Sequence, residues 1–270
     1  MQTCVTNKLS IGGDAPVRLM GVINCSPESF YPNSFFPTDC VHATAVAMVE
    51  QGADMIDIGA RSTAPNTQAI SGKMEAQRID AALSELDGSG ITVSVDTMHP
   101  GVLDVCLKHD IHAVNDIAGL ASTAYAQKVA DAGLPAFVMT SREQPGDAVG
   151  MPATIDALAG VVARCERFGI REYVLDPGVG LWTPARSVDD NWQLCQQFDD
   201  FLCFDRPLLA AISRKTFIGE LIRRDPVDRL AASLAVTMLL LEKGAAVVRT
   251  HDVAETRDAI RVFERMVKGR

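Results

Sequence analysis

The chain has 270 residues, of which 47% are hydrophobic and 22% charged, an ordinary globular composition. The net charge of −9 argues against a general nucleic-acid binder, and no uninterrupted apolar run reaches the ~20 residues that span a bilayer. The first residues lack the basic and apolar regions of a signal peptide. Seven scattered cysteines form no CxxC pair. We therefore expect reduced thiols in a cytoplasmic protein that binds neither nucleic acid nor membrane.

Short β-like runs recur along the chain and end in polar or glycine-bearing segments. They lie at 18–24, 54–59, 91–96, 112–116, 135–140, 172–176, 207–213 and 246–250. Between them, apolar residues at three- and four-residue spacing predict helices, for example at 40–51, 74–87, 153–168 and 226–243.

Strands that alternate with helices predict a parallel sheet, and eight such units favour a single-domain (β/α)8 TIM barrel over 18–270. An open doubly wound sheet is the alternative, but no GxGxxG turn after the first strand supports its dinucleotide-binding version. We expect residues 1–17 to form a short hairpin or lid over the bottom of the barrel. The long loops "CSPESFYPNSFFPTD" and "ARSTAPNTQAISGK" follow the first two strands, where barrel active sites are built.

Polar side chains recur at the strand ends. Each alone is commonly a helix cap or a surface residue, but in a barrel these ends converge on one mouth. Carboxylates and an amide suit a flat heterocycle with N–H donors, and cations suit a ring oxygen or a diphosphate. An amide oxygen suits Mg²⁺ shared with phosphates. The candidates are Asn24, Asp96, Asn115, Asp176, Ser213, Lys215 (expected to be an exposed cation), Arg249 and His251.

Seven blocks carry a family resemblance. "LMGVINCSPESF", "GADMIDIGARSTAP", "VSVDT", "AVNDIAG", "VLDPGVG", "AAISRKTFIG" and "VVRTHDV" resemble, in order, the signature blocks of dihydropteroate synthases, over about residues 18–262. The resemblance implies a TIM barrel that condenses 6-hydroxymethyl-dihydropterin diphosphate with p-aminobenzoate or a related arylamine and releases diphosphate.

The resemblance also implies a role for each candidate. The pterin would be held by Asp96, Asn115, Asp176 and Lys215, and the diphosphate by Asn24, Arg249 and His251, with Mg²⁺ on Asn24. The catalytic set would be Asp96, Asp176, Lys215 and Arg249. The arylamine would lie near Ser26, Pro27, Arg61, Thr63 and Ser213. We expect a homodimer, and the apolar helix 226–241 could serve either the core or a dimer face.

Departures from the family pattern mark a divergent member. Ala64 stands where the family has the arginine of its second loop, and Arg61 where it has glutamate. Thr140 replaces a histidine, and no lysine follows Gly180. These changes predict an altered acceptor pocket. A corrinoid-linked pterin methyltransferase and a non-catalytic pterin-binding paralogue are the alternatives.

Overall fold

The computed structural model describes residues 2–27, 36–62 and 70–269. Its core is a closed barrel of eight parallel strands in the order β10-β3-β4-β5-β6-β7-β8-β9. The predicted TIM barrel is therefore confirmed. The strands are β3 (Arg18–Asn24), β4 (Met55–Gly59), β5 (Val93–Asp96), β6 (Ala113–Asp116), β7 (Ala136–Met139), β8 (Tyr173–Asp176), β9 (Leu208–Ala210) and β10 (Ala245–Thr250).

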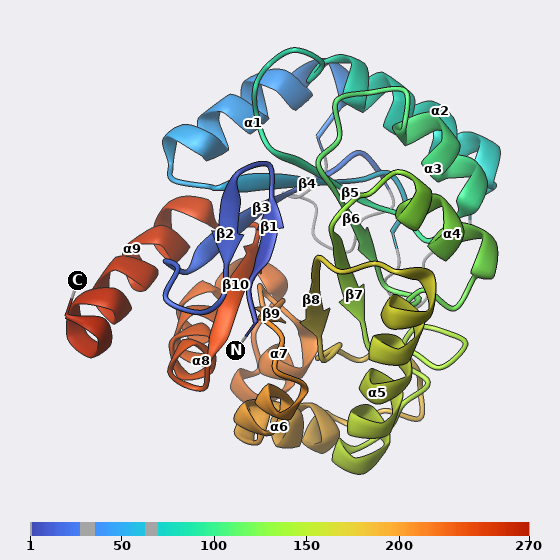
Figure 1. Ribbon diagram of the computed structural model, residues 1–270. Coiled ribbons are helices and arrows are strands. Elements are labelled where there is room, and N and C mark those ends of the chain that lie inside the picture. Colours follow the sequence, from blue (N-terminus) through green and yellow to red (C-terminus); the bar gives the residue numbers. More distant parts are fainter. Residues whose placement is uncertain (1, 28–35, 63–69, 270) are drawn as a thin grey trace.

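Helices surround the strands, as Figure 1 shows. They are α1 (Val41–Glu50), α2 (Gly72–Ser84), α3 (Pro100–Cys106), α4 (Thr123–Asp131), α5 (Met151–Phe168), α6 (Val188–Gln196), α7 (Thr216–Ile222), α8 (Leu230–Glu242) and α9 (Val253–Phe263). No helix in the described part of the chain is long and apolar enough to cross a membrane.

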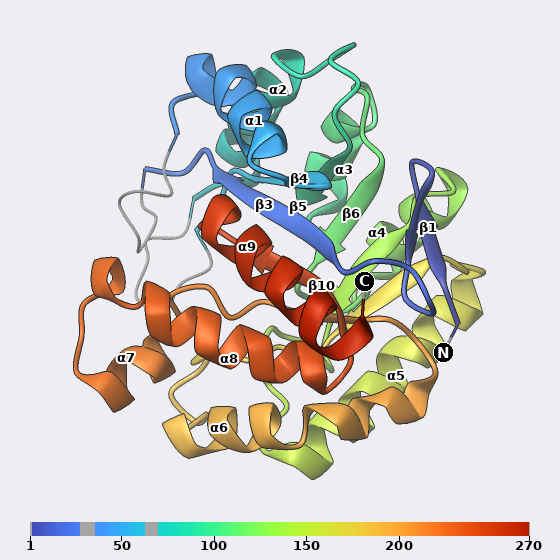
Figure 2. The same ribbon diagram turned by 90° about the vertical axis from the view of Figure 1, so that its left-hand side faces the viewer.

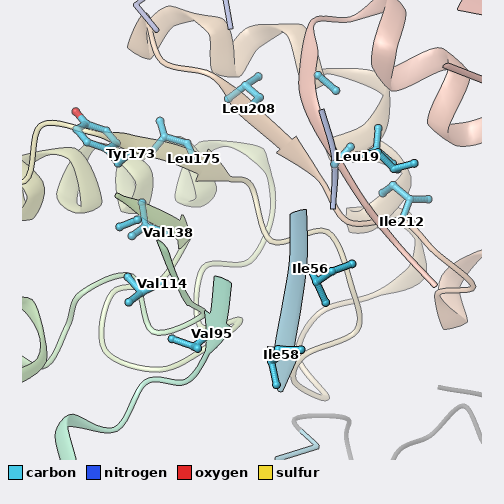
Figure 3. Packing of buried hydrophobic residues seen from close by; sticks show 14 of the residues in the cluster. Leu19, Ile56, Ile58, Val95, Val114, Val138, Tyr173, Leu175, Leu208 and Ile212 are labelled. Carbon is cyan, nitrogen blue, oxygen red and sulfur yellow. The ribbon is translucent and has the colours of Figure 1, made fainter. Parts of the chain in front are cut away.

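Alternating strand residues build two layers of core. Outward-facing side chains such as Ile56, Ile58 and Val95 pack between the barrel and the helices (Figure 3). Inward-facing ones such as Met55 and Phe137 fill the lower barrel. Because side chains alternate along a strand, Asp57 shares the inward side with Met55.

A two-stranded hairpin, β1 (Cys4–Thr6) with β2 (Leu9–Ile11), precedes the barrel. Cys4 and Ile11 pack on the inward-facing cluster, and the Thr6 hydroxyl donates to the carbonyl of His112, just before β6. The hairpin therefore covers the amino-terminal ends of the strands and leaves the opposite mouth for a site (Figure 1).

Two predicted elements are shorter than expected. The run 207–213 is a strand only over Leu208–Ala210, and the left-handed conformation of Arg214 (φ 55°) turns the chain soon afterwards. The predicted helix 226–243 opens with a 3₁₀ turn at Pro226–Asp228, and α8 itself begins at Leu230. In both places a local turn interrupts the apolar pattern.

Candidate active site

A cavity of about 570 Å³ lies at the carboxyl ends of the barrel strands. The strand register places polar residues side by side at this mouth, since Asn24 pairs with Gly59, Gly59 with Asp96 and Asp96 with Asn115. The predicted residues that line the cavity are Asn24, Arg61, Asp96, Asn115, Asp176, Ser213, Lys215, Arg249 and His251.

Three predicted arylamine contacts are not among the described lining residues. Ser26 is buried beside the end of β3, and Pro27 is exposed. Thr63 lies outside the described residues, as does Ala64, so the structure does not describe the position of the missing loop arginine.

An ion-pair network forms one wall of the cavity. Arg249 donates from Nε to Asp57 Oδ2 at 2.7 Å and from Nη2 to Asp96 Oδ2 at 2.8 Å. The amide of Asn115 donates to the same Asp57 oxygen at 2.9 Å. Burial raises the pKa of Asp96 to about 7, Arg249 opposes the rise, and the neighbouring carboxylates add to it. Arg249 is thus held in a fixed plane at the mouth of the barrel.

Asp176 and Lys215 lie on another side of the cavity. Asp176 accepts a hydrogen bond from the backbone of Gly178 at 2.7 Å, and Lys215 donates to the carbonyl of Val179. Burial lowers the pKa of Lys215 to about 8, while the charge of Asp176 opposes that change. Lys215 is half-buried, so the expectation of an exposed cation was wrong. The Lys215 ammonium is therefore a desolvated charge that lines the cavity and can donate to a ligand.

The loop after β9 carries two cations, and only Lys215 lines the cavity among the described residues, whereas Arg214 does not. Arg214 is buried and turns away from the cavity, where it forms a two-pronged pair with Asp252 at 2.6 to 3.2 Å. Ser213 lies beside His251, with 3.0 Å between its Oγ and His251 Nδ1. Burial, with Arg249 nearby, lowers the pKa of His251 to about 4. His251 is therefore neutral near pH 7 and can donate a hydrogen bond without carrying charge.

Arg61 is fixed by a buried carboxylate on α2. Its Nε donates to Glu75 Oε2 at 2.8 Å, and its Nη2 donates to the carbonyl of Ile70 at 2.8 Å. Glu75 is 1% exposed and also accepts from the Thr97 hydroxyl at 2.7 Å. The family resemblance places Arg61 where the pattern has glutamate, and the fold supplies its partner, Glu75.

The loops after β7 and β8 pack against each other and form a further wall of the cavity, which no sequence motif predicted. Trp182 donates from its indole to the carbonyl of Gly178 at 2.8 Å, and the Lys215 ammonium lies 5.2 Å from its ring centroid. Gly146 (φ 79°) packs so tightly on Trp182 that no Cβ fits there. Arg186, 3% exposed, donates to the carbonyl of Ala148 at 2.5 Å. In the sequence, the sign of this wall is Trp182, an aromatic residue that follows Gly178 and Gly180 soon after β8.

The fold and this cavity define a (β/α)8-barrel protein with a charged cavity at the carboxyl ends of its strands. The family description "Pterin binding enzyme" matches residues 20–251. The dihydropteroate synthase of Escherichia coli (strain K12) is 34% identical over 260 residues, which cover 92% of this chain and 90% of that protein.

Solved structures agree. The dihydropteroate synthase of Coxiella burnetii in complex with pteroic acid superposes with a TM-score of 0.86 at 27% identity and covers 98% of each chain. The Xanthomonas albilineans enzyme with 4-aminobenzoic acid gives a TM-score of 0.85 at 31% identity and 97% coverage of each chain. This chain belongs to the pterin-binding enzyme family that includes the dihydropteroate synthases.

Proposed function

We propose that this chain condenses 6-hydroxymethyl-dihydropterin diphosphate with p-aminobenzoate or a related arylamine and releases diphosphate. The observation that carries the proposal is the convergence of Asp96, Asn115, Asp176 and Lys215 with Arg249 and His251 on one cavity. The acceptors suit the N–H donors of a pterin ring, and the cation and neutral imidazole suit a leaving diphosphate.

The residues support a simple displacement. The aniline nitrogen attacks the pterin methylene carbon, the C–O bond to diphosphate breaks, and the nitrogen loses its proton to diphosphate or solvent. Arg249 and His251 would bind the charge that develops on the leaving oxygen, which is the main requirement of this step. Asp96 and Asp176 would stabilise positive charge on the pterin. An aniline is already nucleophilic at neutral pH, so no strong general base is needed.

The proposal includes Mg²⁺ bound together with the diphosphate. No cluster of three His, Cys, Asp or Glu side chains able to hold a metal occurs in the described ranges 2–27, 36–62 and 70–269. Mg²⁺ commonly takes one or two protein oxygens and completes its shell with water and phosphates. The amide oxygen of Asn24 fits that mode, and a bound Mg²⁺ would neutralise charge on the leaving group.

The test is diphosphate release by the purified protein with the pterin diphosphate, Mg²⁺ and a panel of arylamines. Release with p-aminobenzoate or a bulkier arylamine supports the proposal and identifies the acceptor. No release with any arylamine, together with tight pterin binding, would instead establish the non-catalytic paralogue. Methyl transfer from a methyl-tetrahydropterin to cobalamin would establish the methyltransferase.

We expect a narrow, bell-shaped pH profile of kcat/KM with limbs near pH 7 and pH 8. Asp96 must be ionised to accept from the pterin, so activity rises as pH passes its pKa of about 7. Lys215 must be charged to donate strongly, so activity falls as pH passes its pKa of about 8. His251, with a pKa of about 4, contributes no limb in this window. Initial rates from pH 5.5 to 9.5 measure this profile. A plateau across that range would contradict the roles given to Asp96 and Lys215.

We propose a homodimer that uses the outward face of α8. That face carries Ala231, Leu234, Ala235, Met238 and Leu239, with Leu239 59% exposed. Figure 2 shows α8 lying at the surface between α7 and α9. An apolar stripe that faces solvent on a helix is typical of an interface.

We expect Leu239→Lys to convert the dimer to monomer, because a charge would be buried at its centre. Sedimentation velocity measures the change. The outward substitution Val262→Lys on α9 is the matched control, since Val262 is 56% exposed on a different helix. A wild-type monomer at micromolar concentration would contradict the proposal.

The compartment is also a proposal. All seven cysteines are free, and five of them are buried. Free thiols in this number fit a reducing, cytoplasmic location.

A further inference from the structure

Strand β4 (Met55–Gly59) contains an acid in an otherwise apolar, fully buried run. Asp57 is 0% exposed and does not line the cavity. An ionised carboxylate inside a barrel is costly unless it is paired. An apolar residue would continue the pattern of the strand, so this acid needs a reason.

Both partners of Asp57 are site residues. Its Oδ2 accepts from Arg249 Nε at 2.7 Å and from Asn115 Nδ2 at 2.9 Å. A carboxylate only accepts hydrogen bonds, so the amide nitrogen of Asn115 must face Asp57. The amide oxygen of Asn115 is then the group left for a ligand in the cavity.

The second oxygen of Asp57, Oδ1, is buried and accepts no hydrogen bond from the described protein groups. A buried acceptor without a partner destabilises the fold. Such a cost is common at functional sites and is unexpected in a purely structural pair.

We propose that Asp57 is a positioning residue that sets the hydrogen-bond polarity of the pterin site. It turns Asn115 into an acceptor toward the cavity and, together with Asp96, fixes the plane of Arg249. The inference rests on the proposed function, because the acceptor matters only if the ligand presents N–H donors. It goes further by assigning a role to a residue that does not touch the ligand.

The test is calorimetric binding of 7,8-dihydropterin to the full chain and its variants. Asp57→Leu keeps the side-chain volume, removes the acceptor, and frees the Asn115 amide to rotate. We expect it to weaken binding about tenfold or more, the worth of one or two hydrogen bonds. Asp57→Asn still offers an oxygen to both donors, so we expect it to bind within about threefold of wild type. Rescue by this conservative variant would assign the effect to the acceptor oxygen.

The matched control is Asp54→Asn, immediately before the same strand. Asp54 pairs with Arg18 and Arg257 and does not line the cavity. We expect it to lower thermal stability and to leave dihydropterin binding unchanged. A double-mutant cycle of Asp57→Leu with Asn115→Leu should be strongly non-additive, because Asp57 acts through Asn115.

Several results would overturn the inference. They are a folded Asp57→Leu variant with wild-type affinity, an Asp57→Asn variant as weak as Asp57→Leu, or an additive cycle. If Asp57→Leu does not fold, NMR of the wild-type protein provides the test. The Asn115 side-chain amide should exchange its protons slowly, and rapid exchange would reject its hydrogen bond to Asp57. A wild-type protein that binds no dihydropterin would instead overturn the proposed function, and the inference with it.

Discussion

Replacing Arg249 with Met is expected to lower diphosphate release by about 10²-fold or more and to destabilise the fold by about 3 kcal/mol. The guanidinium is the partner of both Asp57 and Asp96, and its loss leaves two neighbouring carboxylates unpaired. The stability loss is taken at the lower end of the range for buried pairs, since Arg249 is 20% exposed. Steady-state rates and urea unfolding measure the two effects.

Arg257→Met is the matched control for that variant. Arg257 also pairs with an aspartate next to β4, namely Asp54, and is 15% exposed, but it does not line the cavity. We expect it to lower stability without changing the rate of the folded enzyme. An Arg249→Met protein with activity within tenfold of wild type would reject the role of Arg249 in binding the leaving group.

Replacing Lys215 with Met is expected to weaken pterin binding by about 10- to 100-fold without destabilising the fold, because the ammonium is a desolvated charge whose pKa burial lowers. Met keeps the apolar stem of the side chain and removes only the ammonium. A hydrogen bond from a charged donor is worth about 1.5–3 kcal/mol, which gives the affinity loss. Calorimetry with dihydropterin and thermal unfolding measure the two quantities.

The pH dependence of stability sharpens that test. The pKa of Lys215 is lowered to about 8 in the fold from 10.5, so between these values the unfolded chain binds more protons. Stability from this group therefore rises with pH across that window, and we expect Lys215→Met to remove the rise. Lys243→Met, which breaks a surface pair with Asp199, is the control and should keep it. An unfolded Lys215→Met protein would show that Lys215 is structural.

Much of the site was predictable because barrel topology converts order in the sequence into nearness in space. Asp96 and Asp176 each end a strand and Asn115 is the last residue but one of its strand, and parallel strands bring their carboxyl ends to one mouth. Lys215 and His251 follow their strands closely in the same way. Their roles toward substrates stay predictions.

Contacts across the barrel were not predictable. Trp182 was not predicted as a site residue, because nothing in the sequence shows that Gly146 and Ala148 hold its loop against the cavity. Ser213 was expected near the arylamine, and the structure places its hydroxyl against His251. Arg61 was recognised as a substitution, but its partner Glu75 lies on α2, 14 residues further along the chain.

The sequence by itself determined the barrel, through the period of its apolar residues, and the chemical types at the strand ends. Only the tertiary structure decided which of those groups are paired and which face a ligand. Asp57 illustrates the difference: in the sequence it is one acid in "MIDIG", and in the barrel it accepts from two site residues on other strands. Periodicity is a local property of the chain, whereas pairing and desolvation depend on distances between strands that only the closed barrel creates.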